Sequence, residues 1–188
     1  MRTAVFAVLC LAANGLSGCG DPAVEAYGPK AAGGLLLKLN RALEADADYT
    51  GESAGKMFCD VIPVAVDRDA EDGVRHVYAD TSCLKLTPRK SGDLAVGTGI
   101  DGEVRFAIRG TGARAQVVDV GYPSLLDADR EELKELFPAK ALRQIDEGPD
   151  DRAAGQDCRQ LAAARERYGL PEAETVGAGA NRENYADC

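Results

Sequence analysis

The chain of 188 residues contains one histidine, His76, and histidine is the usual general base of enzymes that work near neutral pH. At two-residue spacing it is followed by Tyr78, Asp80 and Ser82. Side chains two residues apart lie on one face of a strand, so a cleft there could combine a base, an acid and a hydroxyl in a hydrolase. A histidine on a partly solvated strand face, without a catalytic role, is the simpler interpretation.

The six cysteines are the other residues with chemistry of their own, and one of them ends an export-type segment. Arg2 gives a positive start to an apolar run over residues 4–13. A membrane-spanning helix needs about 20 apolar residues, so this run suits the core of a secretory signal instead. The following Leu16-Ser17-Gly18-Cys19 resembles the lipobox of bacterial lipoproteins. That resemblance implies cleavage before Cys19 and lipid on its thiol; the alternative is an ordinary signal peptide that leaves Cys19 free.

Lipidation would fix the location of the protein. A single acyl chain binds a membrane only marginally, whereas two or more anchor a protein stably. We therefore expect a protein held in the cell membrane through lipid on Cys19, with its folded part outside the cytoplasm.

The remaining cysteines predict disulfides. Cys10 leaves with the signal segment and Cys19 carries lipid, which leaves Cys59, Cys83, Cys158 and Cys188. Four cysteines in an exported protein indicate two bridges, with three possible connectivities.

A hairpin selects among these connectivities. Segments 56–67 and 74–87 alternate like strands, and the turn-rich residues 68–73 separate them. Centring the hairpin on Glu71 sets Cys59 opposite Cys83. The same register pairs Phe58 with Leu84, Val64 with Tyr78 and Val66 with His76. We therefore predict a Cys59–Cys83 bridge.

Cys158 and Cys188 are then left as the second pair, unless Cys188 bonds to another molecule. Pro63 cannot donate a ladder hydrogen bond, so the first strand of the hairpin should be an edge strand or carry a bulge.

The patterns around the hairpin predict an α+β fold: an N-terminal helix packed on a four-stranded antiparallel sheet, with C-terminal helices and a mobile tail. The predicted helices are 35–44, one capped by Ser124 or Asp127 and ended by Pro138, 139–145 and 153–168. The third and fourth strands are 101–109 and 113–122, and 88–99 is predicted to be a turn. The predicted domains are a signal peptide (1–18), a flexible tether (19–34), the α+β domain (35–146) and a helical extension with a mobile tail (147–188).

Composition excludes some functions. The formal net charge is −9, and an acidic chain without a basic patch argues against nucleic acid as a partner. Alternating oxygens at Asp46, Asp48, Thr50 and Glu52 lack the fixed Gly and closing Glu of a calcium loop. We expect no metal and no cofactor.

Part of the chain resembles a family of small exported bacterial proteins without an assigned activity. The matching pieces are Phe58-Cys59, Val77-Tyr78 with the later Cys83, residues 97–102, and Leu136-Phe137-Pro138. The family usually has a Trp after the tyrosine, where this chain has Ala79-Asp80. The resemblance implies a helix against an antiparallel sheet, similar to cystatin-like or NTF2-like folds.

The function that we expect from these features is binding of a small-molecule ligand or a protein partner, without catalysis. The predicted site is the concave face of the sheet beneath the 35–43 helix, where an open apolar cavity would be needed. The alternative is a cell-envelope hydrolase that uses His76.

Overall fold

The computed structural model describes residues 24–27, 33–51, 56–67, 71–123, 130–147 and 155–171. Cys19, Cys188, the predicted signal peptide, the predicted caps Ser124 and Asp127, and residues 172–188 of the predicted tail lie outside the described residues.

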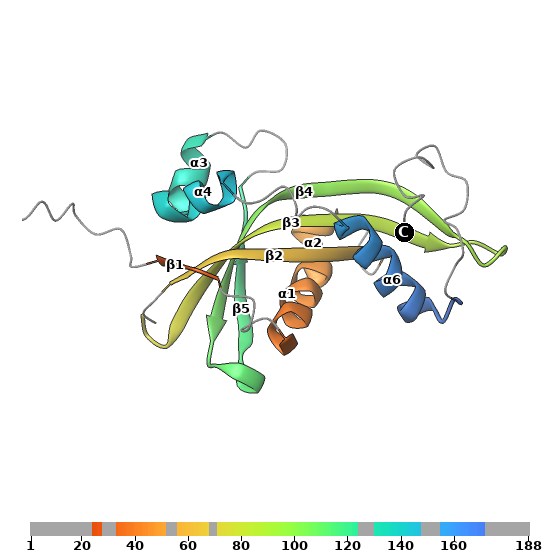
Figure 1. The fold of residues 1–188 in the computed structure, drawn as a ribbon, viewed down its shortest axis with the longest axis horizontal. Coiled ribbons are helices and arrows are strands. Elements are labelled where there is room, and N and C mark those ends of the chain that lie inside the picture. The colour runs from red at the N-terminus through yellow and green to blue at the C-terminus, as the bar shows by residue number, and fades with distance from the viewer. Residues whose placement is uncertain are drawn as a thin grey trace, which may run out of the picture.

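The described chain folds around one antiparallel sheet in which each strand pairs with the next along the sequence (Figure 1). The strands are β1 (Val24–Ala26), β2 (Met57–Asp67), β3 (Val74–Pro88), β4 (Leu94–Arg109) and β5 (Gln116–Gly121). The α+β class is as predicted, but the sheet has five strands where the sequence predicted four.

The additional strand, β1, comes from the segment that we predicted to be a flexible tether. Val24 pairs with Asp67, and Ala26 pairs with Ala65. Gly33, also in that segment, begins helix α1. The tether prediction is therefore wrong for these residues. Three residues are too few to show a strand period, and only the second half of β2, far away in the sequence, gives them a partner.

The β2–β3 hairpin has the predicted register over its first half. Cys59 lies opposite Cys83, and Phe58 lies opposite Leu84. A disulfide joins Cys59 and Cys83, as predicted, with 4.0 Å between the Cα atoms. Both cysteines are buried in the core.

The second half of the hairpin is shifted by one residue. Pro63 still lies opposite Ala79, but a bulge follows, so that Ala65 pairs with Tyr78 and Val66 with Val77. The predicted pairs Val64–Tyr78 and Val66–His76 are therefore wrong. The predicted bulge is present next to the proline, which has no N–H to donate. β2 is an edge strand only before the segment that β1 covers.

The glycine-rich stretch predicted to be a turn is mostly strand. β3 runs to Pro88 and β4 begins at Leu94, so the turn takes only residues 89–93. A Cβ on Gly97 would lie 3.2 Å from the Lys85 side chain, and one on Gly99 would lie 3.2 Å from Leu84. These glycines allow the side chains of β3 to approach β4 closely. The prediction of a turn took the same glycines as turn residues.

One face of the sheet is covered by α1 (Gly33–Ala45) and the short α2 (Ala47–Thr50) (Figure 1). The predicted N-terminal helix is thus confirmed. Leu39, Leu43 and Tyr49 pack against alternate residues of β2, β3 and β4; the most deeply buried of these are Ala79, Cys83, Val104 and Phe106.

The opposite face carries two separate helical layers. At one end, α6 (Gln156–Tyr168) packs Leu161 and Ala164 against Phe58, Leu84, Leu86 and Leu94. At the other end, α3 (Arg130–Leu136) and α4 (Ala139–Asp146) surround Phe137 and Ala141, which contact Tyr78 and Ala65. Both helical regions were predicted from the sequence.

Helix α1 also closes the uncovered edge of β2. The Asn40 Oδ1 accepts the backbone N–H of Val61 at 3.1 Å, and the Glu44 Oε1 accepts that of Cys59 at 3.1 Å. These amides point away from β3 and would otherwise be unpaired, since β1 pairs only with the far end of β2. Two polar residues four apart on one helix thus hold the helix to the strand edge.

Candidate functional site

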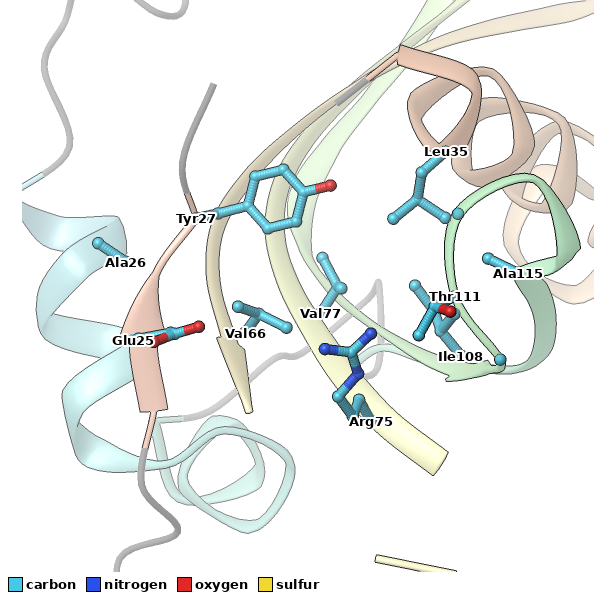
Figure 2. A pocket seen from close by; sticks show the side chains of 12 residues that line it. Glu25, Ala26, Tyr27, Leu35, Val66, Arg75, Val77, Ile108, Thr111 and Ala115 are labelled. Carbon is cyan, nitrogen blue, oxygen red and sulfur yellow. The ribbon is translucent and has the colours of Figure 1, made fainter. Parts of the chain in front are cut away.

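A cavity of about 220 Å³ lies on the α1 face, at the end of the sheet where α1 begins (Figure 2). Its apolar walls are Ala26, Leu35, Val66, Val77, Ile108 and Ala115, and its polar groups come from Glu25, Tyr27, Arg75 and Thr111. The predicted site extended under the whole 35–43 helix. Instead, Leu39 and Leu43 are fully buried, and the cavity lies next to Leu35, near the start of the helix.

Arg75 is the cationic group of the cavity. Arg75 and Val77 are two residues apart on β3, so their side chains lie on the same face of the strand, the one that faces the core. Figure 2 shows its guanidinium on the cavity side, toward Tyr27 and Val66. In the part of the chain that is described, this guanidinium makes no hydrogen bond or ion pair.

Tyr27 forms the side of the cavity next to β1. Its backbone N–H donates to the Val64 carbonyl at 3.0 Å, which fixes the residue that follows the strand. Burial raises the pKa of the Tyr27 hydroxyl, and the positive charge of Arg75 opposes this rise. The hydroxyl is therefore a neutral hydrogen-bonding group at physiological pH.

A loop between β4 and β5 forms the opposite wall, and α1 holds it in place. The Lys38 ammonium donates to the carbonyl oxygens of Ala113 and Ala115, at 2.8 and 2.7 Å. Gly110 enters the loop with φ +81°, and a Cβ there would lie 3.2 Å from the Arg114 carbonyl oxygen. Lys38 therefore holds the loop against α1, and Gly110 allows its backbone to turn at this point.

Sequence reasoning did not find Arg75, Tyr27 or Glu25. A signal for Arg75 was present, because a charged residue at the inward position beside Val77 is unusual in a strand. Tyr27 and Glu25 carried no such signal, since their place at the cavity follows from β1, whose pairing partner is some forty residues away.

His76 lies on the other face of β3, away from the cavity, and bonds to a carboxylate that the sequence did not suggest. Its Nδ1 lies 2.9 Å from the Asp67 Oδ2, which also accepts the His76 backbone N–H at 3.0 Å. The Tyr78 hydroxyl donates to the other oxygen of Asp67 at 3.1 Å. Asp67 is buried and about a third of the His76 side chain is exposed.

This arrangement resembles only part of a catalytic centre. Asp67 orients the imidazole, as an acid does in a hydrolase triad. Among the described residues, no serine, threonine or cysteine side chain is hydrogen-bonded to His76. Asp80 and Ser82 lie further along β3: burial, and secondarily the charges of Glu103 and Asp101, raise the pKa of Asp80.

The acidic segment after α1 serves a structural purpose in the fold. The Asp46 Oδ1 accepts the backbone N–H groups of Asp48 and Tyr49 and caps α2. It also accepts the hydroxyl of Tyr122 from beyond β5, at 3.1 Å. Glu52 lies outside the described residues, and within the described ranges no three His, Cys, Asp or Glu side chains are placed to hold a metal.

Cys158, on α6, is disulfide-bonded, and its partner lies outside the described residues. Its pairing with Cys188 stays a prediction.

Comparison of the chain with family models, with curated proteins and with solved structures finds no match. The resemblances to the lipobox and to cystatin-like or NTF2-like proteins therefore remain predictions from the sequence.

Proposed function

We propose that this protein is an exported lipoprotein, anchored in the cell membrane through Cys19, that binds a small molecule in the cavity between β1, α1 and the β4–β5 loop. The observation that supports it most is the combination of apolar walls with a few polar groups, which is typical of ligand sites.

The size of the cavity limits the ligand. Sites for drug-sized ligands range from roughly 300 Å³ upward, whereas an engineered cavity of about 150 Å³ binds benzene. A cavity of about 220 Å³ therefore suits a molecule with roughly six to ten non-hydrogen atoms.

The proposed anchor would lie close to the cavity. Cys19 stands five residues before Val24, where β1 begins, and an extended chain covers at most about 18 Å over that distance. The end of the sheet that holds the cavity would then stay near the membrane surface. In the described part of the chain no helix is both long and apolar enough to cross a membrane.

Binding is tested with a neutral six-carbon probe, hexan-1-ol, titrated into isotope-labelled protein and followed by amide NMR shifts. We expect saturable shifts at Val66, Val77, Ile108 and Ala115. Val66→Phe, which places a ring in the cavity, should abolish them. Val118→Phe is the matched control, because Val118 is 44% exposed and does not line the cavity. Binding that survives Val66→Phe, or no binding of any six-carbon probe, would contradict the proposal.

The anchor is tested by the intact mass of the protein extracted from membranes. A chain beginning at Cys19 with added lipid mass is expected, and Cys19→Ala should release the protein from the membrane fraction. Recovery of wild-type protein without lipid mass would remove the anchor from the proposal.

A cell-envelope hydrolase remains the second candidate, and the Asp67–His76 hydrogen bond is the observation that favours it. It predicts ester or amide hydrolysis that His76→Gln abolishes while the melting temperature stays within a few degrees. Equal rates in wild-type protein and His76→Gln, across a panel of chromogenic esters and amides, would exclude it.

A further inference from the structure

We infer that Arg75 makes the cavity selective for a small amphipathic carboxylate, whose charged end pairs with the guanidinium and whose apolar part contacts Val66, Val77 and Ile108. This inference rests on the proposed binding function and adds the chemical class of the ligand.

Arg75 supplies the positive charge of the cavity. The guanidinium is partly buried beside apolar walls, and no described residue pairs with it. Removing a cation from water without an opposite charge is unfavourable, so an anion that enters the cavity recovers part of that cost. A carboxylate fits best, because its two oxygens match the two parallel N–H groups of arginine.

Charged groups of both signs lie around the cavity. Glu25, on the β1 side, is the one carboxylate among the described lining residues, and it would repel an anion. Glu25 is exposed to solvent and has an interaction of its own, so its field in the cavity is screened. The Lys38 ammonium is bonded to the β4–β5 loop and adds positive charge near the wall opposite β1. The groups that face the cavity therefore favour an anion.

The lining residues limit the shape of the ligand. Tyr27 and Arg75 supply polar groups, while Leu35, Val66 and Ile108 surround the rest of the space (Figure 2). The cavity has room for an apolar part of roughly three to seven carbons besides the three non-hydrogen atoms of the carboxylate. A carboxylate of this size is water-soluble, so free solution is its expected source, and a long-chain lipid acid exceeds the space.

The test compares hexanoate, hexan-1-ol and hexylammonium on the full chain at low salt, by the same amide shifts and by calorimetry. Charged hydrogen bonds in such sites give roughly 10- to 100-fold in affinity, so hexanoate should bind that much more tightly than hexan-1-ol, and hexylammonium most weakly. Arg75→Gln should remove the preference, so that hexanoate then binds no more tightly than hexan-1-ol. Arg75→Lys should restore part of it, since it keeps the charge without the paired donors.

Two control variants separate this effect from general charge. Arg109→Gln makes the same substitution on the neighbouring strand at an exposed position outside the cavity, and should leave the preference intact. Glu25→Gln should change hexanoate affinity by less than about twofold, because the exposed carboxylate is screened by solvent. Dodecanoate should bind no more tightly than hexanoate; affinity that keeps rising with chain length would overturn the small soluble ligand in favour of a membrane lipid acid.

The outcomes distinguish the two proposals. Hexan-1-ol bound as tightly as hexanoate, or a preference that survives Arg75→Gln, would overturn the role of Arg75 while binding in the cavity still stood. Absence of binding for all three probes would overturn the binding function itself.

Discussion

The Glu44 carboxylate connects three elements of the fold, and its removal gives the sharpest test of how the sheet edge is held. One oxygen accepts the buried N–H of Cys59, and the other pairs with the Arg167 guanidinium of α6. Arg167 in turn lies 4.3 Å over the ring of Phe58. Glu44→Ala should therefore affect α1, β2 and α6 together.

The magnitude follows from the two bonds. Leaving a buried N–H without a partner costs about 1–3 kcal/mol. The pair with Arg167 adds at most about 1 kcal/mol, because 39% of the arginine side chain is exposed and water screens the interaction. The sum is about 1–4 kcal/mol, which for a chain of this length lowers the melting temperature by roughly 2–16 °C.

The assay is thermal unfolding of Glu44→Ala and Glu44→Gln, with amide hydrogen exchange. Glu44→Gln keeps an acceptor for Cys59, so it should lose only about 1 kcal/mol. In Glu44→Ala the Cys59 amide should exchange faster, while Val61, whose acceptor is Asn40, should change little. Glu166→Ala is the control, an exposed glutamate whose loss should stay within about 0.5 kcal/mol. Equal losses for Glu44→Ala and Glu44→Gln would refute the amide argument, because only the charge would then matter.

Three further predictions concern the disulfide of the hairpin, the Asp80 carboxyl on β3 and the cavity wall. Replacing both Cys59 and Cys83 with alanine should destabilise the fold by about 3 kcal/mol through the loss of a 24-residue loop closure, measured by denaturant unfolding against the oxidised wild type. Burial raises the pKa of Asp80, so its ionised form destabilises the folded state at pH 7. Asp80→Asn should therefore raise the melting temperature at pH 7. This gain should vanish as the pH falls through the raised pKa toward about 3.9, where an ordinary aspartate titrates. A gain that is unchanged at pH 3 would contradict this. Gly110→Ala should cost more than about 1 kcal/mol and weaken probe binding, whereas Gly112→Ala, which has φ +56° but no atom within 4 Å of the added Cβ, should cost less; equal losses would show that crowding by Arg114 is unimportant.

Local patterns were enough to predict the helices and the hairpin. Leucines at helical spacing gave α1, and alternation gave β2, β3 and the second half of β4. Paired apolar residues and paired cysteines agreed on one register, and this identified the Cys59–Cys83 bridge. The helices, the strands and the hairpin register depend on residues that are near one another in the sequence. Local sequence patterns are therefore sufficient to predict them.

Only the tertiary structure decided the site. β1 forms because the end of β2 offers backbone groups with which it can pair. The three residues Val24–Ala26 alone do not indicate that this partner strand exists. The bulge after Pro63 shifts the hairpin by one residue, and Asp67 of β2 is hydrogen-bonded to His76 in that shifted register. The cavity is the space left where α1, β1 and the β4–β5 loop do not meet. Such a space depends on the packing of distant elements, which local periodicity cannot determine.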